Sequence, residues 1–188
     1  AAYPDKPIKM IVPFAPGGGA DFTARVVAET LSAKLGQQVV VENRPGAGGL
    51  IGAAAVARAD PDGYTLLYTT PGQQMTLPYL VKEMPYKPED LRPVSQVSLA
   101  PSVLVVNKKL GVKTLQELID LAKKRPGELN FVSAGIGASS HLNGELLQSL
   151  AGIKLQHIPY KGTGEAVKDL VGGNGDMAID TVGIYTAF

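Results

Sequence analysis

The sequence predicts an α/β fold in which helices cover largely parallel β-sheets. Short apolar runs alternate along the chain with segments whose apolar residues recur every three or four positions, as the strands and helices of such a fold do. The 22 glycines and 14 prolines gather in clusters between these segments, which is typical of tight connections. Both halves of the chain follow the same order of strand, glycine-rich loop, helix, stop glycine and strand. This repeat favours two similar lobes, although generic α/β construction would produce the same order.

Composition excludes several classes of protein. Of the 188 residues, 45% are hydrophobic and 19% are charged, which indicates a globular rather than a disordered chain. The net charge of +1 argues against a nucleic-acid-binding protein, which normally carries a basic face. The absence of cysteine excludes disulfides, thiolate metal sites and a cysteine nucleophile. No stretch approaches the roughly 20 apolar residues that a membrane-spanning helix needs.

The elements of the first half follow one another closely. An apolar run at residues 8–14 predicts a buried strand. A helix is expected to begin at Asp21 and to end at Gly36. Its apolar face consists of residues three and four positions apart, namely Ala24, Val27, Leu31 and Leu35. The next elements are expected as a strand at residues 38–42, a helix at 49–58, a turn at 60–63 and a strand at 64–70.

The second half begins after a less regular, proline-rich stretch at residues 75–93. A strand is expected at residues 102–106, and Thr114 with Glu117 forms a capping box that starts a helix. The remaining elements are expected as strands at residues 130–133, 154–158 and 177–180, helices at 139–150 and 165–171, and a last helix towards residue 188.

Two glycine-rich loops carry the strongest functional signal. Residues 13–21 and 133–141 each connect a predicted strand to a predicted helix, where glycine lets the backbone approach a ligand and the helix N-terminus offers unpaired N–H groups to an anion. Neither loop contains lysine or arginine, which suits a carboxylate that must be released again. One such loop would more simply be a tight turn. Two matching loops favour a binding site.

Nucleotide binding and catalysis are poorly supported. Neither loop matches the phosphate-binding or the complete dinucleotide-binding pattern. The two histidines, His141 and His157, are not part of a nucleophile elbow. Asp21 and Asp180 could act as acid and base, but Asp21 could equally stabilise the N-terminus of its helix. No cluster has metal-ligand spacing. We therefore expect no catalytic residue, no metal site and no cofactor.

Eight stretches of the chain carry a resemblance to a known family. They are residues 3–8, 13–21, 41–52, 60–67, 90–94, 133–142, 159–162 and 175–177. In these stretches the chain resembles the extracytoplasmic solute receptors of tripartite tricarboxylate transporters, the Bordetella uptake gene (Bug) family. The likeness follows the same order along essentially the whole chain. One small departure is Ala15, where the family often has proline.

The resemblance implies a two-lobed periplasmic binding protein of the type II class. It places a first lobe at residues 1–98, a second lobe at residues 102–188 and a hinge near residues 99–101. Such a receptor closes on a small organic carboxylate (a dicarboxylate, an amino acid or a related acid) and delivers it to the membrane components of its transporter. Residues 1–3 look like the start of a mature periplasmic form after removal of a signal peptide. Because family members are longer, the chain is expected to be truncated and its first lobe to lack a returning segment.

The resemblance also assigns ligand contacts, made largely through main-chain groups and bridging waters. In the first lobe they fall on Phe14, Ala15, Gly17, Gly18, Asp21, Thr70 and Gly72. In the second lobe they fall on Ser133, Ala134, Gly135, Gly137, Ser139, His141, Thr163 and Asp180. Asp180 could instead cap the helix that follows it. Selectivity depends on a few side chains around the far end of the ligand, for which Gln73, Gln74, Tyr79 and Tyr160 are candidates.

Two further expectations complete the hypothesis. Binding should be insensitive to pH between about 6 and 8, because the two loops contain no group besides His141 that titrates in this range. The alternative function is an enzyme or binding module that acts on a nucleotide or acyl substrate at the same glycine-rich loops.

Overall fold

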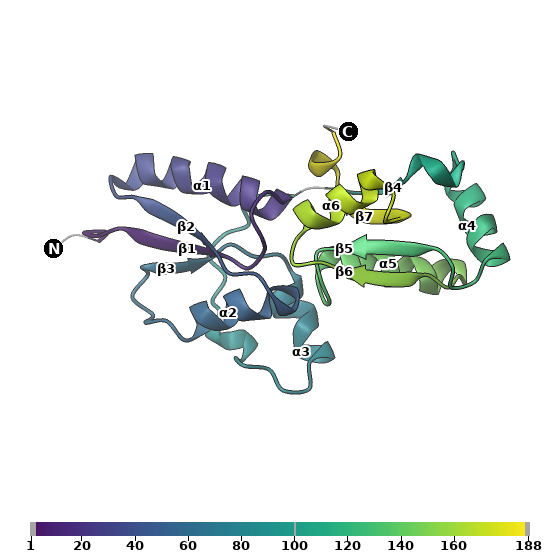
Figure 1. Ribbon diagram of the computed structural model, residues 1–188. Helices are drawn as coiled ribbons and strands as arrows, with labels where there is room; N and C mark the ends of the chain where they lie inside the picture. Colours follow the sequence, from purple (N-terminus) through teal and green to yellow (C-terminus); the bar gives the residue numbers. More distant parts are fainter. Residues whose placement is uncertain (1–2, 100, 187–188) are drawn as a thin grey trace.

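The computed structural model describes residues 3–99 and 101–186 and contains two β-sheets. In the first, β1 (Ile8–Val12) lies between β2 (Val39–Asn43) and β3 (Thr65–Leu67), and both pairings are parallel. The parallel sheet predicted for the first half is therefore confirmed. Helix α1 (Gly19–Leu35) covers one face and helix α2 (Leu50–Ala57) the other (Figure 1).

The second sheet is mixed. Its order is β4 (Ser102–Val106), β7 (Met177–Thr181), β5 (Asn130–Ser133) and β6 (Gln156–Pro159). Strand β4 runs antiparallel to β7, and the other pairings are parallel. For description, residues 3–98 are called the first lobe and residues 102–186 the second lobe.

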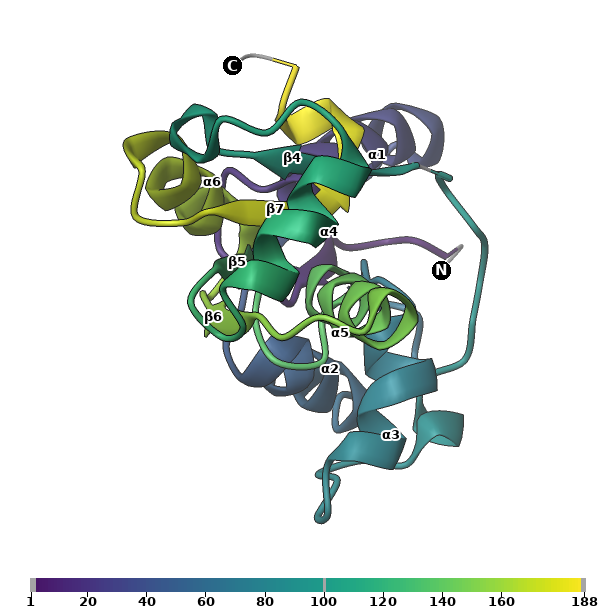
Figure 2. The same cartoon turned by 90° about the vertical axis from the view of Figure 1, so that its right-hand side faces the viewer.

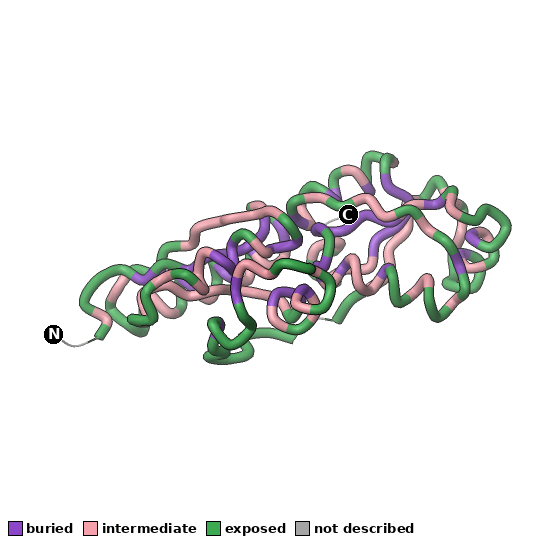
Figure 3. The backbone as a smooth tube through the Cα atoms, turned by 90° about the horizontal axis from the view of Figure 1, so that it is seen from below, coloured by how far each residue is buried: buried purple, intermediate pink, exposed green. Residues whose placement is uncertain are grey.

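Consecutive residues of β5 build the cores on both faces of this second sheet, because neighbouring side chains in a strand point to opposite sides. Phe131 packs with Leu118 of α4 (Leu115–Lys124), and α5 (Ser139–Ala151) contributes to the same cluster. Val132 packs with Leu170 of α6 (Thr163–Gly172) on the opposite face. Figure 3 shows buried residues running through the interior of each lobe.

Local signals set several helix ends as predicted. The Thr114 hydroxyl accepts a hydrogen bond from the backbone N–H of Glu117 at 3.2 Å, and the Glu117 carboxylate accepts one from the N–H of Thr114 at 3.3 Å. Helices α1 and α5 end where Gly36 and Gly152 adopt left-handed backbone conformations, which glycine adopts without strain.

Other boundaries differ from the expectation. Strand β1 stops at Val12, before Pro13, because proline has no N–H for the ladder. Strand β3 is shorter than expected because its pairing with β1 ends at Leu67. The last predicted helix is a single 3₁₀ turn at Val182–Ile184, and residues 187–188 lie outside the described residues.

The stretch between the two sheets is only partly regular. It contains the four-residue helix α3 (Leu77–Leu80) and a short turn at Pro88–Asp90. Residues 92–99 are exposed and have no regular structure, and this connection runs along one side of the molecule in Figure 2. The predicted hinge includes residue 100, which lies outside the described residues. Within the described ranges, no helix is long and apolar enough to cross a membrane.

Candidate functional site

The carboxyl ends of the parallel strands in the two sheets point towards one another at the junction of the lobes (Figure 1). The helix that follows each strand therefore begins near the same junction. A Cβ atom built on Gly18, which precedes α1, would lie 3.6 Å from the backbone nitrogens of both Thr163 and Gly164 at the start of α6. The N-termini of α1 and α6 thus face each other across the junction.

Several contacts between the two lobes involve backbone atoms. The N–H of Ala15 donates a hydrogen bond to the carbonyl of Lys161 at 3.1 Å. A Cβ built on Gly48 would lie 1.6 Å from the Ile136 carbonyl oxygen, and one on Gly72 would lie 2.6 Å from the Gly137 carbonyl oxygen. Neither position has room for a side chain while the lobes are in contact.

Asp21 lies in the first turn of α1 and is buried. Its carboxylate accepts hydrogen bonds from the Gly17 N–H at 3.0 Å, from the Asn43 amide at 2.8 Å and from Arg25 at 3.1 Å. Burial by itself raises the pKa of Asp21, but these donors outweigh burial and hold the pKa below its ordinary value. Both carboxylate oxygens are therefore engaged within the first lobe, where they fix the loop before α1.

Asn43 belongs to this arrangement although sequence reasoning missed it. Its amide nitrogen also donates to the Phe14 carbonyl at 3.0 Å. The sequence feature that could have indicated Asn43 is its position directly after the strand predicted at residues 38–42. Side chains at the ends of neighbouring parallel strands lie close together, and Asn43 pairs with Val12 of β1.

Gln73, one of the candidates for selectivity, makes its hydrogen bonds within the first lobe. It is fully buried. Its amide oxygen accepts hydrogen bonds from the hydroxyls of Thr69 and Thr70 at 2.7 and 3.1 Å, and its amide nitrogen donates to the Gly48 carbonyl at 2.6 Å. Gln73 therefore holds the connection at Gly48 against the turn that begins at Gly72.

Of the other three candidates for selectivity, two make hydrogen bonds within their own lobes and one is highly exposed. The Gln74 amide donates to the Leu91 carbonyl within the first lobe. Tyr79 is 89% exposed on α3. The Tyr160 hydroxyl donates to Asp169, and burial together with this hydrogen bond raises the pKa of Tyr160 to about 12.

In the second lobe, side chains occupy several N–H groups of the loop at residues 133–138. The N–H of Ala134 donates to the Ser140 hydroxyl at 3.0 Å. The N–H of Gly135 donates to the Ser133 hydroxyl at 3.1 Å, and the N–H of Gly137 donates to Nδ1 of His141 at 3.0 Å. These predicted site residues therefore shape the loop through internal hydrogen bonds.

The N–H groups left for a ligand lie in the first turns of three helices. The first turn of any helix has N–H groups without an intrahelical acceptor. Within the described ranges, the backbone N–H groups of Gly18 and Gly19 before and in α1, of Ser139 in α5, and of Thr163 and Gly164 in α6 have no hydrogen-bond acceptor. The Ser139 hydroxyl likewise has no partner in these ranges. The start of α5 lies close to the first lobe, because Ala134 and Ala138 pack in that lobe's core.

Asp180 is half-buried at the end of β7, between the starts of α5 and α6. Its carboxylate accepts hydrogen bonds from the Thr163 hydroxyl at 3.0 Å and from the Thr181 N–H at 2.7 Å. Burial raises the pKa of Asp180, and these hydrogen bonds offset only part of the rise. The nearby Tyr185 hydroxyl is buried and has no partner within the described ranges. Burial raises the pKa of Tyr185 as well.

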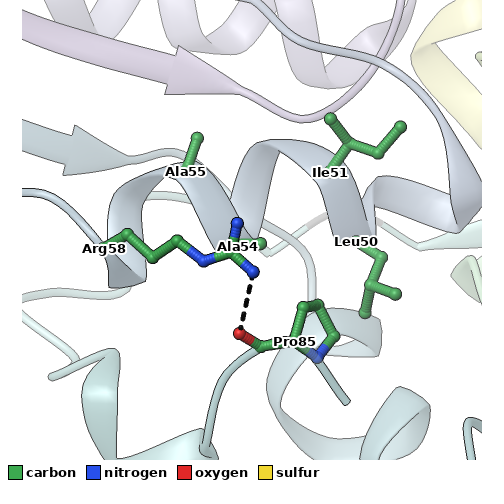
Figure 4. A pocket seen from close by; sticks show the side chains of 6 residues that line it. All are labelled: Leu50, Ile51, Ala54, Ala55, Arg58 and Pro85. Carbon is green, nitrogen blue, oxygen red and sulfur yellow. Dashed lines mark hydrogen bonds between the residues drawn. The ribbon is translucent and has the colours of Figure 1, made fainter. Parts of the chain in front are cut away.

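Two apolar hollows lie away from this junction. One is on the outer side of α2, where the only polar contact drawn in Figure 4 joins Arg58 to the Pro85 carbonyl. The other lies between β4 and α4. Neither brings together polar groups suited to an anion. Within residues 3–99 and 101–186, no group of three or more metal-ligating side chains could hold a metal ion.

Comparison with known proteins gives consistent matches to one family. A family model described as "Tripartite tricarboxylate transporter family receptor" matches residues 23–188. The chain is 50% identical over 173 residues to protein BugT of Bordetella pertussis, which covers 91% of this chain and 53% of BugT. The present chain thus spans about half the length of the curated relatives that it matches.

Two solved structures from Rhodopseudomonas palustris are also similar. Rpa4515, solved with adipate, is 35% identical with a TM-score of 0.95 over 99% of this chain and 62% of its own. MatC, solved with bound malate, is 33% identical with a TM-score of 0.92 over 97% of this chain and 62% of its own. The fold predicted from sequence, an α/β periplasmic binding protein with parallel-rich sheets flanked by helices, is confirmed.

Proposed function

This chain belongs to the tripartite tricarboxylate transporter receptor family, and we propose that it captures a small organic carboxylate between its two lobes. The family is one of solute-binding proteins and not of enzymes. The receptor would work in the periplasm and deliver the acid to the membrane components of a tripartite tricarboxylate transporter. The adipate and malate in the two related structures support a carboxylate as the ligand class.

The observation that carries this proposal is the meeting of helix N-termini at the lobe junction. Helices α1, α5 and α6 begin there with N–H groups that have no acceptor in the described ranges. Each helix N-terminus carries the equivalent of roughly half a positive charge. An anion is therefore stabilised without a lysine or arginine, and it can leave again because no full opposite charge has to be separated from it.

Binding by these groups requires both lobes. The first turn of α1 belongs to residues 1–98, and those of α5 and α6 belong to residues 102–188. Neither lobe alone surrounds an anion, so we propose that the lobes close about residues 99–101 and that the ligand stabilises the closed arrangement.

The predicted site residues divide into two groups in this proposal. Those proposed to contact the ligand are Gly18, Ser139 and Thr163, with Asp180 beside them as an acceptor for a hydroxyl or amino group. Those proposed to hold the contacting residues in place are Phe14, Ala15, Gly17, Asp21, Thr70, Gly72, Ser133, Ala134, Gly135, Gly137 and His141. The second group is supported by the internal or lobe-to-lobe contacts of these residues.

Isothermal titration calorimetry on the full-length protein tests the function. The panel would contain adipate, malate, succinate, acetate and aspartate. ATP and acetyl phosphate would be included to test the alternative function on a nucleotide or acyl substrate. We expect at least one carboxylate to bind and the phosphate compounds not to compete for it. The proposal would be contradicted if no carboxylate bound, or if the phosphate compounds displaced a bound carboxylate.

Replacement of Ser139 by alanine should weaken carboxylate binding about fivefold, which corresponds to the ~1 kcal/mol of one lost hydrogen bond. The Ser139 side chain is half-buried and its hydroxyl has no partner within the described ranges, so thermal stability should not change. Ser140→Ala is the matched control. The Ser140 hydroxyl accepts the Ala134 N–H in a buried position, so this variant should lower the melting temperature. Equal affinity of Ser139→Ala and the wild type would remove Ser139 from the site.

A further inference from the structure

Three aromatic rings from three elements stack beneath the loop at residues 133–138. The Phe131 ring on β5 lies 4.7 Å from the His157 ring on β6, and His157 lies 4.1 Å from His141 on α5, measured between ring centroids. The planes of each pair are within 17° of parallel. His157 was not among the predicted site residues.

Both histidines hold the backbone of this loop. Nδ1 of His141 accepts the Gly137 N–H at 3.0 Å, so this nitrogen carries no proton of its own. Nε2 of His157 lies 2.6 Å from the Ser133 hydroxyl, which in turn accepts the Gly135 N–H at 3.1 Å. The position of Gly137 thus depends on an unprotonated Nδ1 in His141. Gly135 is linked to His157 only through the Ser133 hydroxyl.

A proton on either ring is unfavourable in this arrangement. Burial lowers the pKa of His141, with a partial opposing effect from Glu145. Burial and the neighbouring His141 lower the pKa of His157 to about 4. The charged group that faces the pair is Glu145 of α5, 3.6 Å from Nε2 of His141. The two side chains of β5 that contact His157, Phe131 and Ser133, carry no charge.

The same loop makes the closest approach to the first lobe. Its Ile136 and Gly137 carbonyls face Gly48 and Gly72. If His141 became protonated at Nδ1, the hydrogen bond from Gly137 would be lost. Protonation of both rings would also place two cations in the stack, and these would repel each other. The loop could then no longer present its carbonyls to the first lobe in the same position.

We propose that His141 and His157 are positioning residues that shape the loop at residues 133–138 for lobe closure, and that protonation of the pair opens the loop and releases the ligand. This inference rests on the proposed function. It goes beyond that function because it assigns a proton-dependent step to side chains that lie behind the ligand-contacting surface.

The direction of the pH effect follows from the lowered pKa values. In this structure burial lowers the pKa of both imidazoles from the ordinary 6.5, and an opening of the loop that exposes the rings to water would remove part of that lowering. Protonation therefore favours the open form. Affinity should be constant above about pH 7 and should fall as the pH drops below 6.5 towards 4. This proposal departs from the insensitivity expected between about pH 6 and 8 only at the acidic end of that range.

The test compares the full-length wild type with a double variant, His157→Gln with His141→Asn. The glutamine and asparagine amides can replace the imidazole hydrogen bonds but do not titrate. These are the only two histidines in this chain. Adipate is the probe, titrated calorimetrically from pH 4.5 to 7.5. The variant provides the baseline for the titration of adipate itself and of Asp180. We expect the Kd of the wild type to rise at least tenfold more than that of the variant. Parallel profiles would overturn the inference.

A second measurement does not depend on the variant or on ligand binding. In ¹H–¹⁵N NMR spectra of the wild type, the amide signals of Gly135 and Gly137 should titrate together with the imidazoles, with a midpoint below 6.5. Amide signals that stay in place while the imidazoles titrate would refute the inference, even if adipate does not bind at any pH. A failure to bind adipate at pH 7.5 with co-titrating amides would count against adipate as ligand and leave the positioning role standing.

Discussion

Replacement of Gly72 by alanine should weaken ligand binding by roughly two orders of magnitude while both lobes stay folded. The added methyl group would lie 2.6 Å from the Gly137 carbonyl oxygen of the other lobe. The backbone at Gly72 is outside the left-handed region, so alanine introduces no strain there. The lobes would have to move apart, and the N-terminus of α1 would then no longer meet those of α5 and α6.

The matched control for this variant is Gly172→Ala. A Cβ on Gly172 meets nothing within 4 Å, and its backbone is likewise outside the left-handed region. Calorimetry measures the affinity, thermal unfolding reports whether the lobes stay folded, and small-angle X-ray scattering with saturating ligand reports whether the lobes close. Binding of Gly72→Ala at wild-type strength would mean that the contact between Gly72 and Gly137 is not needed in the ligand-bound form.

Replacement of Gly18 by valine should abolish binding, whereas alanine at the same position should be tolerated. A Cβ on Gly18 would make ordinary contacts of 3.6 to 3.7 Å with Thr163 and Gly164. The two further methyl groups of valine would enter the space between the first turns of α1 and α6, which is where we place the carboxylate. Gly17 is less suitable for this test because its φ of +86° strains any side chain.

The Gly18 series separates a binding role from a structural one. Near-ultraviolet circular dichroism and thermal unfolding would be recorded for both variants, and we expect the second lobe to remain folded in each. If Gly18→Val keeps normal affinity, the loop before α1 is only a structural turn and the assigned site is wrong. If Gly18→Ala already abolishes binding, the space between the two helix N-termini is too narrow for the proposed ligand.

The sequence predicted features that depend on neighbouring residues. The capping box of Thr114 and Glu117, the stop at Gly36 and the strand at residues 102–106 are found where the local pattern placed them. Each is governed by contacts within a few positions along the chain. The length of β3 was not predictable in this way, because it depends on where the partner strand β1 ends.

The internal organisation of the site could not be read from local pattern. Asn43 reaches Phe14 across 29 positions, Gln73 reaches Gly48 across 25, and His157 reaches Ser133 across 24. These contacts decide which N–H groups of the glycine-rich loops are already occupied. The clustering of glycines did indicate close backbone approach, but it could not indicate that the approaching backbone belongs to the other lobe.

Backbone atoms make several of the contacts between the lobes. Closure of the lobes and selection of the ligand therefore need not depend on the same side chains. Every residue type has a backbone carbonyl, so the approach of the Ile136 and Gly137 carbonyls to Gly48 and Gly72 does not depend on which side chains lie elsewhere in the lobes. The proposed closure of the lobes and the discrimination between one acid and another can therefore vary independently. A receptor of this design could be retuned from one acid to another by exchanging a few side chains near the bound molecule. If the lobes close as proposed, a dye attached across the junction would convert such a receptor into an optical sensor for each new acid.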